Sequence, residues 1–460
     1  MKETLELGTK PIGTLLIRYS IPAIIAMLVN AIYNIVDRIF IGRLVGEDAL
    51  AGLTIAFPIM MIIFAFCGLI GIGGAALLSI KLGEKKYHEA NRVFANTLLM
   101  GFIITATILI LFFINIEMIL MIFGADIDTL GYSKTYMQII LGGFIFQMLS
   151  FIFSNFVRTE GKPRLSMMVM LVAAIMNIIL DYVFIGLMGL GVAGAAYGTI
   201  IGQFSGLMIY LVYYFSKKSI IRVSLRDFIL DLSIAKSILS IGAATFLSTL
   251  GTSFSLTLLN RGLLEYGGTA AVTSIGAINS LYTFFVMPII GITQGMQPII
   301  GYNYGARNYS RVFETLKKAM WIGFIFSTIV FIFMELFATF FVGLFLETGS
   351  ETIPMAAHGL RIFILMLPVL TISFMGTAFH QSIARGNMSM FLGLLRQFIF
   401  FIPLVIVLPK VWGLTGIWIV TPIADGLAVA VTVIALLKTY RSMMHEYKGD
   451  TNHEEATQTI

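Results

Sequence analysis

The sequence predicts an all-α polytopic membrane protein with twelve transmembrane helices. The chain has 460 residues, of which 58% are hydrophobic and only 12% are charged, and its mean hydropathy is +0.94. A soluble fold could not cover so much apolar surface with so few charges. Windows of about 20 apolar residues, each long enough to cross a bilayer core about 30 Å thick, recur along the whole chain. These runs are unbroken, whereas the strands of a membrane barrel would alternate apolar and polar residues.

The apolar windows give the position of each helix to within a few residues. The connections between them are short and carry most of the charged residues. The predicted spans are 15–41, 49–78, 93–115, 132–155, 165–188, 191–215, 235–261, 270–300, 315–337, 356–382, 391–409 and 413–438.

The distribution of Lys and Arg predicts the orientation in the membrane. Cytoplasmic loops retain positive charge, and all but six of the 30 Lys and Arg residues fall on the side of the N-terminus. Both termini are therefore expected in the cytoplasm, with the protein in the cytoplasmic membrane. The net charge of +6 then describes a basic collar facing lipid headgroups, and it is no evidence for nucleic acid. The six exceptions are Arg38, Arg43, Lys134, Arg261, Arg361 and Lys410.

Short motifs recur in the two halves of the chain and indicate an internal repeat. Because each half holds six helices, the repeats should be parallel and related by a pseudo-twofold axis along the membrane normal, with a transport cavity between two lobes. We expect an N-lobe over 1–215, a cytoplasmic loop over 216–234, a C-lobe over 235–439 and a polar cytoplasmic tail over 440–460. The matching motifs are SIPA at 20–23 with SIGA at 240–243, GEKKY at 83–87 with GARNY at 305–309, and GVAG at 191–194 with GLTG at 413–416.

The sequence offers no catalytic signature, so no enzyme activity and no cofactor are expected. It contains no HExxH, GxxxxGK[ST], GxSxG or paired CxxC motif. Residues 189–194 match GxGxxG, but neither a preceding strand nor a following acid is present, and small residues there allow close helix packing. Any energy for transport should therefore come from an ion gradient.

Three carboxylates lie well inside predicted helices: Asp37, Asp181 and Asp425. An ionisable group near the bilayer centre costs at least about 2.5 kcal/mol, so such groups are rare and are functional candidates. Asn177 and Asp181 stand at positions i and i+4 of one helix and therefore share a face. Asp37 and Thr199 are expected at a similar depth, in the outer half of the same lobe.

Together these oxygen-bearing side chains predict a cation site. Carboxylates, an amide carbonyl and a hydroxyl suit a hard cation, and protonation of either acid could replace the ion. In the alternative, Asp181 only hydrogen-bonds Asn177 or a neighbouring helix, a contact worth about 0.6 kcal/mol. That gain is small beside the cost of a buried acid, which favours the cation site. The coupling ion is expected to be Na⁺ or H⁺, held by Asp37, Asn177, Asp181 and Thr199.

The stretches around these residues resemble the multidrug and toxic compound extrusion (MATE) family. The resemblance covers essentially the whole chain and is nearest to the DinF-like prokaryotic branch. It implies the MATE/MOP fold and a cation-coupled antiporter that alternates between inward-open and outward-open states and exports cationic or amphipathic organic molecules. The motifs are YNIVDRIFIG at 33–42, RTEGK at 158–162, NIILD at 177–181 and GVAGAAYGT at 191–199.

The same resemblance implies roles for further residues. The carbonyl of Ala195 would join the cation site, and the neighbouring substrate cavity would be lined by Asn30, Tyr33, Tyr136 and Asn155. The sequence departs from the family pattern at Tyr182, where many relatives have proline. It also has no buried acid in the seventh and eighth helices, because Glu265 is expected in an external loop. We expect a monomer in contact with membrane lipid.

The remaining polar residues of the spans have other interpretations. Asp425, near mid-depth in the twelfth helix, either serves the C-lobe cavity or makes a structural hydrogen bond. His380 and Arg396 are expected near cytoplasmic helix ends, where long side chains can extend to the headgroups. Pro22 removes a backbone hydrogen bond to residue 18, so the first helix should have a hinge on the cytoplasmic side of Asp37.

Two alternatives to drug export stay open at this stage. A lipid-linked saccharide flippase of the same superfamily should carry several basic residues in its cavity to hold a diphosphate. A channel or receptor, which belongs to a different class, would not need paired half-repeats with two acids in one lobe. The sequence does not specify the natural substrate.

Overall fold

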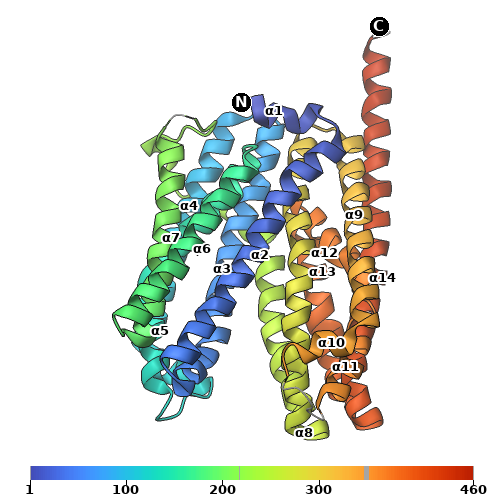
Figure 1. The fold of residues 1–460 in the computed structure, drawn as a ribbon. Helices are drawn as coiled ribbons and strands as arrows, with labels where there is room; N and C mark the ends of the chain where they lie inside the picture. The colour runs from blue at the N-terminus through green and yellow to red at the C-terminus, as the bar shows by residue number, and fades with distance from the viewer. Residues whose placement is uncertain (1, 217, 347–351, 459–460) are drawn as a thin grey trace.

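The computed structural model describes residues 2–216, 218–346 and 352–458, and every regular element in these ranges is a helix (Figure 1). The prediction of an all-α fold is thus confirmed. The first half of the chain begins with a short helix and continues with six crossing segments. These elements are α1 (Lys2–Thr9), α2 (Ile12–Leu44), α3 (Glu47–Gly83), α4 (Tyr87–Ile122), α5 (Leu130–Thr159), α6 (Pro163–Asp181) with its π-helical extension η1 (Tyr182–Leu187), and α7 (Gly191–Phe215).

The second half contains two helices that are too long to cross a membrane once. At 1.5 Å per residue, the 74 residues of α8 (Leu232–Gly305) would extend for about 110 Å if straight. The backbone of α8 reverses at Gly268, with φ 66° and ψ −164°, and that of α14 (Ile402–Gln458) breaks at Gly413, with φ 56° and ψ −136°. Only glycine adopts such angles without strain. Figure 1 shows the two arms of α8 side by side, joined at the end opposite the termini.

Dividing these two helices at their glycines gives the predicted twelve spans. Nine helices among the described residues are long and apolar enough to cross a membrane, and α11 with α12, bent by 50°, form a tenth span. The breaks at Gly268 and Gly413 add two more. Gly268 lies in a predicted loop, and Gly413 is the first residue of the predicted twelfth span. Glu265 accordingly lies exposed in the helix just before Gly268, and no separate loop holds it. The other elements are η2 (Leu225–Asp227), α9 (Tyr309–Leu336), α10 (Ala338–Gly343), α11 (Thr352–Phe363), α12 (Leu367–Ser382), α13 (Gly386–Leu394) and the π-helix η3 (Leu395–Phe401).

The two halves pack against each other at the end of the molecule that carries both termini (Figure 1). There α3 and α8 approach at glycines: a Cβ added to Gly73 would lie 2.2 Å from the carbonyl oxygen of Ile238, and one on Gly242 would lie 1.8 Å from that of Leu69. One hydrophobic cluster crosses this contact. A second cluster, over residues 259–424, lies in the second half alone.

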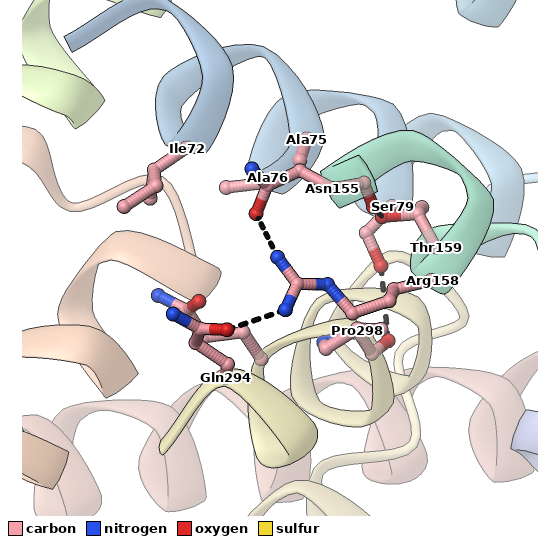
Figure 2. A pocket seen from close by; sticks show the side chains of 10 residues that line it. Ile72, Ala75, Ala76, Ser79, Asn155, Arg158, Thr159, Gln294 and Pro298 are labelled. Atoms are coloured by element: carbon pink, nitrogen blue, oxygen red, sulfur yellow. Dashed lines mark hydrogen bonds between the residues drawn. The ribbon is translucent and has the colours of Figure 1, made fainter. Parts of the chain in front are cut away.

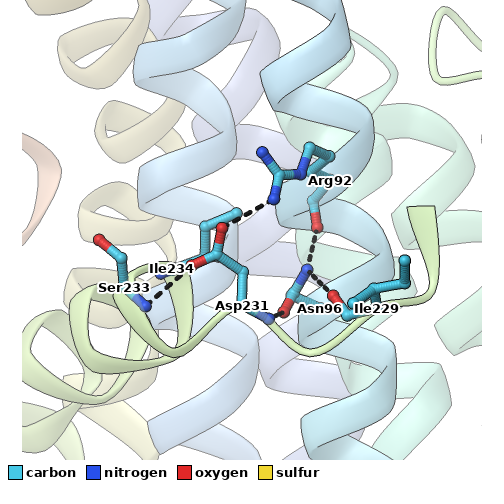
Figure 3. A network of polar contacts seen from close by, with 6 residues as sticks. All are labelled: Arg92, Asn96, Ile229, Asp231, Ser233 and Ile234. Atoms are coloured by element: carbon cyan, nitrogen blue, oxygen red, sulfur yellow. Dashed lines mark hydrogen bonds and ion pairs between the residues drawn. The ribbon is translucent and has the colours of Figure 1, made fainter. Parts of the chain in front are cut away.

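Two segments outside the crossing helices reinforce this end. In α1, Thr4 donates a hydrogen bond to the carbonyl of Glu160 in the first half, and the carbonyl of Leu7 accepts one from Asn303 in the second. The segment between α7 and α8 is held to α4, because Arg92 pairs with Asp231 at 2.8 Å and Asn96 bonds the backbone of the same segment (Figure 3). Hydrogen bonds and an ion pair therefore hold the chain together at the end where the two halves meet, which is called the closed end below.

The chain beyond residue 439, predicted as a polar tail, continues α14 as helix to Gln458. Residues 459–460, the end of that predicted tail, lie outside the described residues, as does residue 217 of the predicted inter-lobe loop.

Candidate functional site

Asp37 and Asp181 face each other between α2 and α6, in the half of the molecule away from the termini. Their carboxyl groups interact directly. Both are buried, with 7% and 0% of their surface exposed. Asp37 lies seven residues before the end of α2, and Asp181 lies six residues before the end of η1, which continues α6. Each therefore stands about 10 Å from the end of its span.

The third helix of this group is α7, which contributes a hydroxyl. Asn177 donates a hydrogen bond to Thr199 Oγ1 at 3.3 Å, and both side chains are buried. Small residues of α7 allow this contact, since a Cβ on Gly198 would lie 2.5 Å from Asp181 Oδ1. The four residues predicted from the sequence to hold a cation thus lie together, and Ala195 lies buried one helical turn before Thr199.

This group has a surplus of buried oxygen atoms. No hydrogen-bond donor among the described residues reaches Asp37 Oδ1, Asn177 Oδ1 or either carboxylate oxygen of Asp181. Arg38, next in sequence to Asp37, is exposed and stacks on Phe57 instead, 4.9 Å from the ring centre. Four acceptors without donors fit a bound Na⁺ or an added proton, because a buried acceptor is costly until something positive meets it. No cluster of three or more His, Cys, Asp or Glu suited to a metal occurs in the described ranges.

The residues implied as a substrate cavity fall into two places. Tyr136, on α5, is buried within electrostatic range of both acids, and Tyr33 lies one turn before Asp37. Asn30 hydrogen-bonds the Tyr33 hydroxyl at 3.5 Å. Asn155 does not join them, because it follows Tyr136 by 19 residues on the same helix, about 28 Å along its axis.

Asn155 instead lines a small cavity between the halves, near the closed end. It accepts a hydrogen bond from Arg158 at 2.7 Å, and Arg158 also donates to Gln294 of α8 (Figure 2). The sequence analysis did not assign a role to Arg158 or Gln294. Arg158 begins the motif RTEGK at 158–162, which could have drawn attention to it, but it lies beyond the predicted span 132–155 and falls among the charges predicted to be cytoplasmic.

In the second half, Asp425 is paired with an arginine. Arg396, within the π-helix η3, donates to Asp425 Oδ1 at 2.7 Å and to the hydroxyl of Tyr282 at 3.2 Å, and it stacks on Phe374. The prediction that Arg396 extends to the headgroups is therefore wrong, because a buried carboxylate binds its guanidinium more favourably than a helix end could. This partner was missed because the two residues are 29 positions apart.

The expectation for His380 is also wrong. Its ring is fully buried and bonds the carbonyl of Gly376 at 2.7 Å and the hydroxyl of Thr439 at 3.0 Å. The bond to Gly376 lies within α12, and the bond to Thr439 joins α12 to α14, so His380 packs between helices and does not extend to the membrane surface.

Two local features shape the first half. The helix α2 stays continuous through the buried Pro22, which lies between Ser20 and Ile24, both packed against glycines of α8. After Asp181, α6 changes to the wider π-helical winding at Tyr182. Single π-helical turns are frequent at functional sites.

A family model described as MatE matches the chain twice, over residues 22–183 and 244–407. The chain belongs to the MATE family. The resemblance predicted from the motifs is thereby confirmed. One match lies within the first half of the chain and the other within the second half. The multidrug export protein MepA of Staphylococcus aureus strain MSSA476 is 28% identical over 431 residues, which are 93% of this chain and 94% of MepA. MepA of Staphylococcus saprophyticus is 29% identical over 428 residues, or 92% and 91% of the two chains.

Solved structures of MATE transporters have the same fold. The MATE multidrug transporter DinF-BH is 37% identical, with a TM-score of 0.87 over 94% of this chain and 96% of that one. An outward-facing MATE transporter of the MOP superfamily is 26% identical, with a TM-score of 0.90 over 96% and 98%. This MATE protein is therefore a multi-pass membrane transporter and not an enzyme.

Proposed function

We propose that this chain is a cation-coupled multidrug exporter that works as a monomer in the cytoplasmic membrane, with both termini in the cytoplasm. The observation that carries the proposal is the set of four buried oxygens on Asp37, Asn177 and Asp181 that no donor reaches. Na⁺ or H⁺ would supply the missing positive charge. MepA and DinF-BH, which are described as multidrug proteins, support small organic molecules as the substrates.

The two halves, residues 1–215 and 235–439, would be the moving lobes. With the termini in the cytoplasm, the contacts between α3 and α8 close the inner end, so the acid pair lies toward the outside. A cation between Asp37 and Asp181 removes the repulsion between the carboxylates and favours closer packing of α2 on α6. Pro22 lies on α2 between this site and the closing contact, and it would serve as the hinge that connects them.

Cation and substrate are then linked through two arrangements of one lobe. The cation favours the arrangement in which α2 is drawn onto α6, and the substrate favours the other. Coupling of this kind is typically worth about 1 to 3 kcal/mol, so saturating cation should weaken substrate binding by about 5-fold to 150-fold.

A flippase for lipid-linked saccharides is supported less well. A diphosphate would require several available basic groups, but Arg38 stacks on Phe57 and Arg396 is bound by Asp425. The small cavity between the halves is lined by a single basic side chain, that of Arg158. A channel or receptor is excluded by the family assignment.

The test is dye efflux from proteoliposomes under Na⁺ and H⁺ gradients imposed separately. We expect one of the two gradients to drive efflux, and the same cation to weaken dye binding to the purified protein. Efflux that ignores both gradients, together with equal dye affinity with and without cation, would overturn the proposal.

A further inference from the structure

The buried Arg158 lies where the two halves meet. It occupies the last turn of α5, with 5% of its surface exposed. Its two terminal nitrogens donate to the side-chain oxygens of Asn155, on the same helix, and of Gln294, on α8 in the other half (Figure 2). The bond to Gln294 therefore exists only while the halves are together at this end.

The charge of Arg158 is not balanced by the protein. No carboxylate of the described residues forms an ion pair with its guanidinium, and both of its partners are neutral amides. Glu160, only two residues away, is turned aside and accepts bonds from Ser219, Tyr213 and the backbone of Ile220. A buried cation without a counter-charge is costly, and a bound anion would remove that cost.

A cavity adjoins the guanidinium and contains further donors. The space open to the centre of a water molecule there is about 20 Å³, enough for ordered water but not for a drug. Among the described residues, Gln294 Nε2 meets only the thioether sulfur of Met27, at 3.7 Å. Gln297 of the same helix also lines the space, and its Nε2 donates to Gln381 Oε1 at 3.3 Å. On the facing side, Ile72 and Ala76 of α3 form an apolar wall. A buried guanidinium beside an apolar wall suits an amphipathic anion, with Gln294 as the group that the anion displaces.

We propose that this cavity is an anion subsite, which widens when the halves part at this end and there binds the carboxylate of an amphipathic substrate. The carboxylate takes the place of Gln294 on the Arg158 guanidinium, while the apolar body of the substrate lies against α3. The transporter then accepts zwitterionic substrates as well as cationic ones. This inference rests on the proposed export function.

The test compares rhodamine B, which carries a free carboxylate, with its ethyl ester, which has the same ring system without that negative charge. Binding to purified protein is followed by fluorescence polarisation, and efflux is followed in proteoliposomes. Arg158→Gln should weaken rhodamine B binding by about tenfold or more, the loss expected for a charge-assisted hydrogen bond, and should leave ester binding within about twofold. Arg158→Lys keeps the charge but loses the planar guanidinium, so its affinity for rhodamine B should lie between those of the wild-type protein and Arg158→Gln.

Gln294→Leu supplies a second variant that keeps the arginine. Because Gln294 competes for the guanidinium, its removal should tighten rhodamine B binding and leave the ester unaffected. If Arg158→Gln weakens the binding of both dyes equally, or weakens the binding of neither, Arg158 only holds the halves together and the subsite is rejected. If Arg158→Gln does not fold, weaker rhodamine B binding in Gln294→Leu overturns the subsite. Gradient-driven efflux of the ester reports on the export function separately.

Discussion

Each half of the molecule buries carboxylate side chains between its helices, but the two halves treat their charge differently. In the first half, Asp37 and Asp181 face each other and their free oxygens meet no donor. In the second half, Asp425 is bound by Arg396, which is held in turn by Tyr282. The first arrangement can gain a positive charge from solution, whereas the second already holds one. Under the proposed function, the two halves share one fold but only the first would bind the ion.

The largest effect should follow from neutralising either acid of the first half. Asp37→Asn and Asp181→Asn should each abolish gradient-driven efflux, because an amide fills the space but cannot take up and release the charge. Expression and helix content, checked by circular dichroism, should stay near normal. Asp128→Asn, on an exposed acid outside the spans, is the matched control. If either variant still couples efflux to the gradient, the acid replaced in that variant is not part of the cation site.

The same substitution in the second half should affect stability instead. Asp425→Asn leaves Arg396 buried without a counter-charge, which typically costs about 3 to 5 kcal/mol, and the melting temperature in detergent should fall. Replacing both residues, as Asp425→Asn with Arg396→Gln, should recover most of the loss and keep ion-driven efflux. If the double variant is stable but uncoupled, the contrast between the two halves is wrong.

A further difference between the halves lies at the SIPA and SIGA motifs, where Pro22 matches Gly242. Gly242 is packed directly on the backbone of Leu69, while Pro22 interrupts hydrogen bonding within α2. Pro22→Ala should therefore preserve folding and cation binding, but reduce the effect of saturating cation on substrate affinity to about twofold or less. Titration of a fluorescent substrate with and without cation measures this. Unchanged coupling would reject the hinge and leave the cation site standing.

The smallest effect should come from the hydroxyl of the site. Thr199→Val keeps the shape of the side chain but removes the acceptor of the Asn177 amide. Loss of one neutral hydrogen bond is worth about 0.5 to 1.5 kcal/mol, so the cation concentration for half-maximal efflux should rise by about 2-fold to 13-fold. Thr199→Ser, which keeps the hydroxyl, is the control. An equal rise in Thr199→Ser would attribute the effect to packing.

The sequence by itself determined the membrane class, the twelve spans and the residues of the acid site. Apolar length and turn glycines are local properties, so the break at Gly268 falls in an expected loop and the break at Gly413 falls at the expected start of the twelfth span. The spacing of Asn177 and Asp181 is also local, since i and i+4 share a face in any helix. The polar side chains of the first half could therefore be placed at one depth before any packing was known.

Only the tertiary structure decided which polar groups meet across helices. Arg396 reaches Asp425 over 29 positions, and Arg158 reaches Gln294 over 136. The sequence could not show these pairs, because lipid and protein interior are both apolar and no polar stripe marks which face of a helix is turned inward. Rotation of each helix about its axis is set by the fit of small residues against neighbouring backbone, as at Gly73 and Gly242. In the packed helices, no basic side chain of the described residues pairs with Asp37 or Asp181, whereas Arg396 pairs with Asp425.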